Sequence, residues 1–470
     1  MDNKLTKKFG LLTAICMVVG IVIGSGIFFK AGKVLTNVGG NIGKALLVVG
    51  LVGLIMIICS LVFATLGTKF ERVNGIVDYA EATLGPRYAY YVGWFMTTMY
   101  YPIITSTLAW ISVMYASTLF SVTLPAWLHF LLAIGVLVIS FLVNTLSPKI
   151  AGYFQVSTTF IKLVPLILVA IVGTIAGLCN GLTLDAFKTV IEGTTAGGVK
   201  VNDNIFIGVS AFAFAYEGWI IATAINAEIK NGKRNLPIAL VLGSIIVIAV
   251  YMLYFIGMTG AISTENMIDS GDSLPKKVFT ALFKSKAMGT IIMVFVVLSC
   301  LGTVNGLVCG CTRGMYSLAV RNEGPSPVLF SKINGKTNMP VYSAIFGFIV
   351  CVIWLAQWQF IFFGKILPAF WCWEGDEVSI ITLYAFYIPM FIGMMVKCKD
   401  LHPIKRFVLP GLATICCLFM CYCAYDAYKA NYQIFSYLLV FAIIMIIGFF
   451  FSGDFTALKN LFKRKNTTEE

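Results

Sequence analysis

Charged residues are scarce in this sequence. Asp, Glu, Lys and Arg make up 12% of the 470 residues, whereas 59% are apolar and the mean hydropathy is +0.90. Soluble globular proteins contain about 25% charged residues. The composition therefore excludes a soluble protein.

Histidine is rarer still, because the chain has only His129 and His402 and no His-Glu-x-x-His motif. Chemistry inside a membrane needs a nucleophile with its base, or a set of metal ligands. We therefore expect no enzyme, no metal and no other cofactor. A channel is also disfavoured, because the apolar segments contain isolated polar residues rather than charged rings or a continuous polar path.

Apolar segments recur along the whole chain and predict an all-α membrane protein. One membrane-spanning helix needs about 20 apolar residues. Twelve transmembrane helices are predicted, at 9–37, 43–67, 88–118, 124–145, 152–177, 203–228, 237–262, 285–312, 339–357, 375–396, 407–427 and 433–452. An even number of spans puts both termini on one side of the membrane.

Basic residues select that side. The termini and the loops on their side hold 22 of the 34 Lys and Arg residues. Since cytoplasmic loops are enriched in basic residues, we expect both termini in the cytoplasm and a multi-pass protein of the cell membrane. The net charge of +13 is then a topology signal rather than a nucleic-acid signature.

Two spans contain residues that interrupt an apolar helix. The first has Gly24-Ser25-Gly26 near mid-depth, and the sixth has Glu217-Gly218. A broken helix exposes backbone groups that lipid cannot satisfy, so it persists only against protein, water or a ligand. Spans 1 and 6 are the first helices of two five-span units, and breaks at such corresponding positions point to a transporter site between inverted repeats.

The ends of the broken helices select the ligand. Carbonyl groups around 21–23 and 212–214 present the negative end of a helix dipole and favour an ammonium group. Amides at Ser25, Gly26 and Ile27 present the positive end and favour a carboxylate. A ligand with both groups on one carbon atom is an amino acid.

The residues at the two breaks are also compatible with purely structural roles. Gly24-Ser25-Gly26 is typical of helix packing in membranes, but the second break favours a site. Phe214 and Tyr216 are ordinary core aromatics unless they gate the site, and their place at the break favours gating. Glu217, near the start of a half-helix, is stabilised by the helix dipole, so we prefer a capping role to a proton-carrying one.

Lys162 is the most specific single residue. It lies about 10 residues into its span and roughly 15 Å deep, where a charged side chain is costly and functional by default. A structural pin to backbone carbonyls or to Glu217 is compatible with a coupling role, and both interpretations stay open. Asn305 in span 8 is either a contact between helices or a wall of the site, and the sequence does not separate the two.

In these residues the chain resembles the amino acid, polyamine and organocation transporter superfamily, and within it the bacterial L-type amino acid transporter family. The matching segments are 19–20 with 23–28, 162–165, 214–219, Glu228 with 234–237, and Cys300, Asn305, Gly306 and Arg313. The resemblance implies a leucine-transporter-like fold with a 5+5 inverted-repeat core in residues 1–396. Two further helices and a cytoplasmic tail then occupy residues 397–470.

The resemblance also implies roles for the site residues. The amides of 24–26 hold the substrate carboxylate, and the carbonyls of Val22, Phe214 and Glu217 meet the amino group. Phe214 is the outer gate, and Lys162 takes the position that sodium occupies in sodium-coupled relatives. The whole expected substrate-binding set is Val22, Ile23, Gly24, Ser25, Gly26, Phe214, Ala215, Tyr216 and Glu217, with Lys162 in a coupling role.

The resemblance implies sodium-independent movement of amino acids, usually by exchange, and the predicted function is therefore exchange of small neutral L-amino acids by alternating access. The alternative is a proton-coupled symporter in which Lys162 or Glu217 loses and regains a proton, and a non-transporting sensor or a channel follows. The expected partners are the amino acid and membrane lipids, with no nucleic acid and no required subunit.

Two segments depart from the family pattern. Residues 74–79 keep one glycine, Gly75, where paired glycines are common. The segment 371–377 reads Trp-Cys-Trp-Glu-Gly-Asp-Glu. We expect it to be a solvated loop, with an extracellular acidic and aromatic lip as the alternative.

Overall fold

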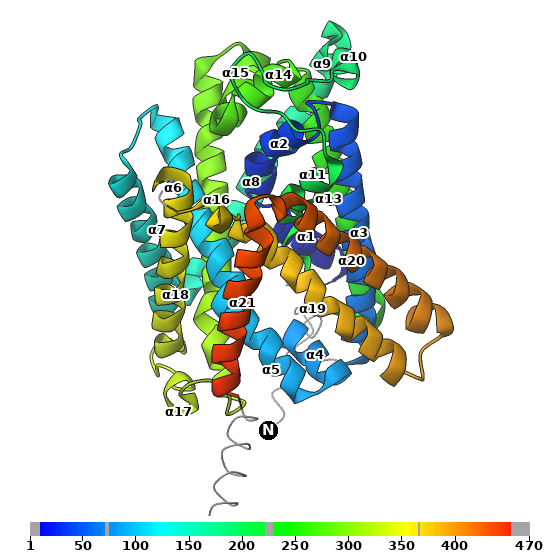
Figure 1. Ribbon diagram of the computed structural model, residues 1–470, viewed down its shortest axis with the longest axis vertical. Helices are drawn as coiled ribbons and strands as arrows, with labels where there is room; N and C mark the ends of the chain where they lie inside the picture. The colour runs from blue at the N-terminus through cyan, green and yellow to red at the C-terminus, as the bar shows by residue number, and fades with distance from the viewer. Residues whose placement is uncertain (1–9, 71–74, 221–228, 365–366, 453–470) are drawn as a thin grey trace, which may run out of the picture.

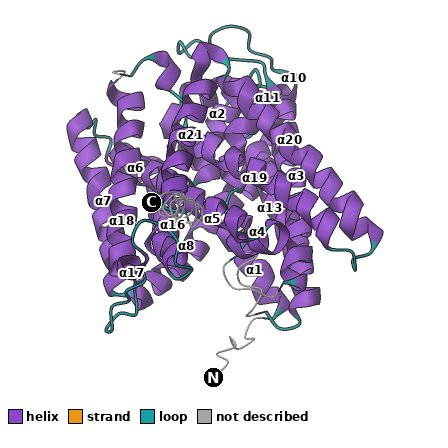
Figure 2. Cartoon of the chain, turned by 60° about the horizontal axis from the view of Figure 1, so that its bottom comes forward, coloured by secondary structure: helices purple, strands orange, loops and turns teal. Residues whose placement is uncertain are grey.

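Helices joined by short loops make up the protein (Figure 1, Figure 2). The computed structural model describes residues 10–70, 75–220, 229–364 and 367–452. The two chain ends, Asn74 and Glu228 lie outside these ranges. Within them, β-structure is limited to two isolated bridges. Helices satisfy their backbone groups internally, which lipid requires of a single spanning segment.

Ten helices of the described chain are long and apolar enough to cross a membrane, and each coincides with a predicted span. Two of them are composite. One joins α5 (Pro86–Phe95) to α6 (Tyr101–Phe120) through the π-helix Met96–Tyr100, and the other joins α8 (Pro148–Leu168) to α9 (Thr174–Asn180) through the π-helix Val169–Gly173. The others contain α3 (Ile42–Lys69), α7 (Ala126–Leu146), α13 (Gly232–Thr259), α16 (Lys286–Ala319), α18 (Val341–Gln359), α19 (Gly375–Lys397), α20 (Leu409–Tyr428) and α21 (Gln433–Phe450). Their outer sides expose large apolar side chains such as Leu131, Ile139 and Ile353, as contact with lipid requires.

The other two predicted spans contain the expected interruptions. The first is divided into α1 (Leu11–Val22) and α2 (Gly26–Asn37). The sixth begins with α11 (Ile205–Phe212) and the 3₁₀ turn Ala213–Tyr216, after which the chain leaves the helical conformation. Both predicted breaks are therefore confirmed.

Short helices mark the two ends of the molecule (Figure 1). At one end lie α10 (Leu182–Lys188), α14 (Thr264–Asp269) and α15 (Leu274–Phe283), and we call it the α14 end. At the other lie α4 (Ile76–Leu84) and α17 (Pro327–Phe330), and we call it the α4 end.

The broken helices are enclosed by unbroken ones. Helix α13 packs against α1 and α3, while α11 packs against α2, α3 and α20. Helix α16 packs against α6, α8 and α18 and forms another wall. The last helix, α21, lies along α5, where Tyr90 and Trp94 donate hydrogen bonds to the carbonyls of Gly448 and Ile444 at 2.7 and 2.9 Å.

Candidate functional site

The break in the first span consists of three residues. Ile23 ends α1 in an extended conformation, with φ −68° and ψ 101°, and α2 begins at Gly26 after Ser25. Val22, Ile23, Gly24, Ser25 and Gly26 are all buried. The first amides of α2 have no partner within their own helix, so their donors point towards whatever lies before it.

The break in the sixth span lies at Glu217 and Gly218, as predicted. The α-helix ends at Phe212, within the predicted 212–214, and the chain continues as a 3₁₀ turn to Tyr216. Glu217 is extended, and Gly218 has φ +106°, a conformation that glycine adopts without strain. The 3₁₀ turn tightens the chain before the break and keeps Phe214 and Ala215 at the centre of the protein.

The two breaks touch each other at Gly26. A Cβ atom on Gly26 would lie 2.8 Å from Ala215 Cα and 3.2 Å from the Phe214 carbonyl oxygen. Only glycine permits this approach, because real Cβ atoms do not come so close to backbone. The contact brings the start of α2 next to the end of the 3₁₀ turn.

Tyr251 of α13 joins the two breaks. Its hydroxyl donates to the Ala215 carbonyl at 2.9 Å and lies 3.4 Å from the carbonyl oxygen of Val22. The side chain is fully buried. Sequence reasoning missed Tyr251, because an aromatic residue inside an apolar span gives no sign of the carbonyl groups that it will meet.

A cavity of about 320 Å³ opens beside this contact. Eight of the ten residues predicted for substrate binding or coupling line it, namely Val22, Gly24, Ser25, Gly26, Lys162, Phe214, Ala215 and Glu217. The remaining wall is formed by Tyr100, Ile104, Leu108, Gln155, Gly218, Thr303, Gly306, Leu307 and Cys309. Helices α6, α8 and α16 thus complete a site that begins at the two breaks.

Ile23 and Tyr216 are not among the lining residues. Ile23 is fully buried within the first break. The Tyr216 hydroxyl donates to the Val49 carbonyl of α3 at 3.0 Å, so the ring is directed into the packing between helices. Of the two aromatic residues considered as gates, only Phe214 borders the cavity.

Lys162 lines the cavity with a side chain that is almost wholly buried. With the described part of the chain, its side chain forms no ion pair and no hydrogen bond. The carboxylate of Glu217 instead accepts a hydrogen bond from the Tyr100 hydroxyl. The structure therefore brings Lys162 and Glu217 to one cavity without pairing them.

Asn305 connects helices rather than lining the cavity. Its side chain accepts from Asn144 at 2.9 Å and donates to the Ala151 carbonyl at 3.0 Å. It also donates to Gln155 at 3.3 Å, and Gln155 does line the cavity. Asn305 thus joins α7, α8 and α16 and supports the wall from behind.

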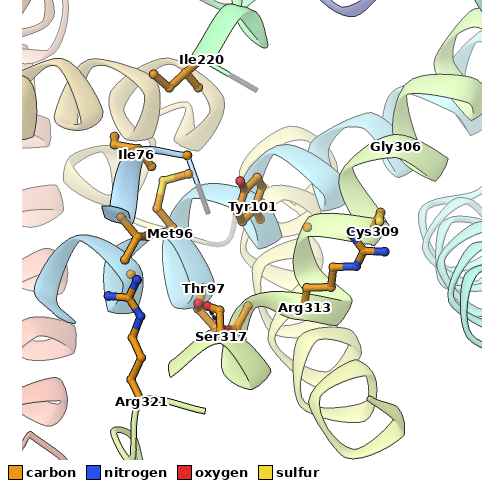
Figure 3. A pocket seen from close by; sticks show the side chains of 15 residues that line it. Ile76, Met96, Thr97, Tyr101, Ile220, Gly306, Cys309, Arg313, Ser317 and Arg321 are labelled. Carbon is orange, nitrogen blue, oxygen red and sulfur yellow. Dashed lines mark hydrogen bonds between the residues drawn. The ribbon is translucent and has the colours of Figure 1, made fainter. Parts of the chain in front are cut away.

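A second cavity, of about 280 Å³, lies next to the first and is bordered by residues of α4 such as Ile76 (Figure 3). Gly306 and Cys309 line both cavities. Figure 3 shows Arg313 and Arg321 among the side chains around it. Arg321 pairs with Asp78 of α4 at 2.6 Å and with Glu81 at 3.3 Å. The second cavity therefore adjoins the site on the side of α4.

Between the cavity and the α14 end, packed side chains fill the space. The rings of Phe29 and Phe214 meet edge to face with centroids 6.4 Å apart. Beyond them, Lys30 is fully buried among carboxylates of 371–377. The prediction that 371–377 is a solvated loop is wrong, because Asp376 and Glu377 are buried at the start of α19 and hold Lys30.

Three comparisons relate the chain to known proteins. A family model described as amino acid permease matches residues 9–456. The serine/threonine exchanger SteT of Bacillus subtilis (strain 168) is 28% identical over 409 residues, which cover 86% of this chain and 86% of that protein. The cystine/glutamate transporter of Homo sapiens is 25% identical over 433 residues, covering 89% and 80% respectively. The crystal structure of MhsT in complex with L-phenylalanine is 15% identical and matches with a TM-score of 0.58, covering 87% of this chain and 98% of that one, which shows a shared fold.

Replacing Gly26 with alanine tests the contact between the breaks. The added Cβ meets backbone, and such overpacking costs about 1–3 kcal/mol, or roughly ten- to a hundredfold in affinity. We expect amino acid binding, measured by titration of the purified protein, to weaken by this factor while the protein stays folded. Gly135→Ala in α7 is the control, because its Cβ meets nothing within 4 Å. Unchanged affinity in Gly26→Ala would refute the close approach.

Tyr251→Phe tests the link between the breaks. The Ala215 carbonyl loses its donor, and we expect the free energy of unfolding to fall by about 1 kcal/mol and binding to weaken with it. Tyr254→Phe is the matched control, since Tyr254 is buried on the same helix and contacts Phe28 through its ring at 5.8 Å. Equal thermal stability of the two variants would show that Tyr251 does not hold the breaks together.

Proposed function

Because the chain belongs to the amino acid permease family, it is an amino acid transporter, and we propose that it exchanges small neutral L-amino acids by sodium-independent alternating access. The main support is the meeting of two helix breaks in one cavity. Backbone donors from one break and backbone acceptors from both then lie within reach of a single small molecule.

The breaks match the two charged groups of an amino acid. The amides of 24–26 stand at the positive end of α2 and suit a carboxylate. The carbonyls of Val22 and Phe214 suit the ammonium group. The Phe214 carbonyl already accepts from the Glu217 amide at 3.3 Å, but a carbonyl oxygen has two lone pairs and retains one for the substrate.

The charge of the lining supports a neutral substrate. Lys162 and Glu217 are the cavity residues with ionisable charges of opposite sign, so their sum is zero when both are ionised. A zwitterion adds no net charge to this cavity. A substrate with a charged side chain would leave one charge uncompensated in a buried site, which is costly. The similarity to a serine/threonine exchanger favours small side chains.

Lys162 supports independence from sodium. Its ammonium group supplies a fixed positive charge at the cavity, so the site needs no bound cation to balance Glu217. Exchange follows if the loaded carrier reorients more readily than the empty one. Bound substrate supplies hydrogen-bond partners to backbone groups of the two breaks, and these groups lack such partners in the empty carrier.

The proposed topology has twelve spans with the α4 end and both termini in the cytoplasm of the cell. Spans 1–5 and 6–10 form the inverted repeats within residues 1–396, and the helices from 397 onwards form an addition. In this topology the α14 end is extracellular, and the described conformation is open to the inside.

Transport by purified protein in proteoliposomes tests the function. We expect L-serine, L-threonine or L-alanine inside the vesicles to stimulate uptake of the labelled amino acid, with no requirement for sodium. Accumulation in empty vesicles driven by a pH gradient would instead establish a proton-coupled symporter. Specific binding without any flux would identify a sensor.

Lys162→Met separates coupling from binding. Loss of the ammonium group changes the relative energies of the conformations, so we expect exchange to slow about tenfold or more, equivalent to 1.4 kcal/mol, while the dissociation constant changes little. Lys188→Met, an exposed position in α10, is the control. If affinity collapses while bound substrate still turns over, Lys162 belongs to the binding shell.

A further inference from the structure

A buried ionic cluster closes the α14 end, and it consists of Lys30, Lys33, Glu374, Asp376 and Glu377. Lys30 Nζ lies 2.9 Å from Glu374, 2.8 Å from Asp376 and 2.8 Å from Glu377. Lys33 contacts Glu374 and lies 2.6 Å from Glu377. The two lysines come from α2, while the carboxylates lie at the start of α19, so the cluster joins half of a broken helix to span 10.

The cluster is connected to the candidate site. Lys30 Nζ lies 4.9 Å from the Phe29 ring centroid and 5.7 Å from that of Phe214. Phe214 lines the cavity, and its backbone touches Gly26. Moving α2 away from α19 to open the α14 end therefore separates Lys30 from the carboxylates.

The charges of the cluster do not balance. Three carboxylates face two ammonium groups, and the interior members Lys30, Asp376 and Glu377 have side-chain exposures of 0%, 0% and 2%. With every group ionised, the cluster keeps one excess negative charge, and two of its three carboxylates, Asp376 and Glu377, are buried. An uncompensated buried charge is costly, and binding a proton removes it.

Among the residues that the structure describes, the neighbouring elements do not supply the missing positive charge. Helix α20 contributes the Tyr428 hydroxyl, which donates to Glu377 at 2.6 Å, and α11 contributes Ser210 at 3.4 Å from the same carboxylate. Asp426 and Lys429 pair with each other at 2.6 Å and add no net charge. Helix α6 presents Ile103 to the start of α19. The excess of one carboxylate therefore stands.

Asp376 is the least stabilised of the three carboxylates. Glu377 has both lysines, Tyr428 and Ser210 around it, and Glu374 has both lysines and is partly exposed at 21%. Asp376 has one partner among the described residues, Lys30 at 2.8 Å from Oδ2, and its other oxygen atom, Oδ1, has none. The N-terminus of α19 stabilises acidic residues near it. Because all three carboxylates lie near that N-terminus, its effect does not remove the difference in their other partners.

We propose that Asp376 binds a proton from the medium at the α14 end more readily when that end is closed, and returns the proton to the same medium when α2 and α19 separate. The proton forms an O–H bond on the Asp376 carboxylate in the closed state and passes to water on opening. It is not carried across the membrane, because the cluster faces one side in both states. The proposal rests on the alternating access of the proposed function and adds a regulatory proton site to it.

The sign of the pH effect follows from linkage. Where Asp376 is protonated in the closed state and ionised in the open state, the closed state binds one more proton, so acid at the α14 end stabilises closure. For one linked proton, the ratio of closed to open populations changes by at most about tenfold per pH unit. The apparent affinity for substrate from that side falls with the open fraction, so its KM rises as the pH is lowered.

Right-side-out membrane vesicles, loaded with L-serine and with their internal pH clamped, test the proposal. The apparent KM for external L-serine is measured between external pH 5.5 and 8 for the wild type, Asp376→Asn and Asp203→Asn. Asparagine resembles the protonated carboxyl group in shape and lack of charge. Asp203 pairs with Lys44 at 2.6 Å on the same side of the molecule and is half exposed, so it is a control for surface charge.

We expect the wild type and Asp203→Asn to show a KM that rises by up to about tenfold per pH unit as the medium is acidified. Asp376→Asn should lose this dependence and keep a high KM at every pH. Saturable exchange with a flat wild-type profile, or a pH slope retained by Asp376→Asn, would overturn the proposal.

Hydrogen exchange of the wild-type protein in nanodiscs gives a second measurement that needs neither transport nor a folded variant. After correction for intrinsic exchange, deuterium uptake by α2 should fall on acidification relative to α7. An unchanged ratio would overturn the proton site. A changed ratio in a protein that exchanges no amino acid would support the site and refute the exchanger.

Discussion

Two interrupted helices touch at the centre of this protein, and the rest of the site depends on that contact. A backbone that leaves the helix inside a membrane must find partners in protein, water or ligand. Gly26 lets α2 reach the 3₁₀ turn at Phe214 and Ala215, and Tyr251 holds the carbonyls of both breaks. The remaining backbone groups line the cavity, which is why the binding site and the structural irregularity coincide.

The surroundings of this contact are unequal on its two sides. Towards α4, two cavities share Gly306 and Cys309, and small residues of α16 leave the space between them. Towards α14, Phe29, Phe214 and the Lys30 cluster fill the space. This asymmetry fits the alternating access that we propose, in which a movement of α2 away from α19 would open the α14 end.

Two buried lysines, Lys30 and Lys162, differ in the number of carboxylates around them. Lys30 is surrounded by more carboxylate than it neutralises, whereas Lys162 faces a cavity without a recorded ion pair in the described chain. A lysine with abundant partners favours the state in which those partners are near and thereby stabilises closure. A lysine without one suits the coupling role that we propose, because its electrostatic interactions would change as substrate and helices move. The same residue type thus serves two purposes, according to the charges around it.

The sequence by itself determined the helices, both interruptions and the burial of Lys162, because these depend on local composition against the solvent properties of lipid. A glycine pair or a carboxylate at mid-depth disrupts a spanning helix wherever that helix packs. Only the tertiary structure decided that Phe214 borders the cavity while Tyr216 points to Val49. The orientation of the 3₁₀ turn about its own axis decides which of its side chains face the cavity, and that orientation depends on packing. Tyr100, Tyr251 and Lys30 were missed for a related reason. The polar composition of 371–377 indicated a solvated loop, yet Glu377 is buried in an ion pair with Lys30, which lies 347 positions earlier in the sequence. Pairing across such separations is fixed by the packing of whole helices, and no local pattern in the chain records it.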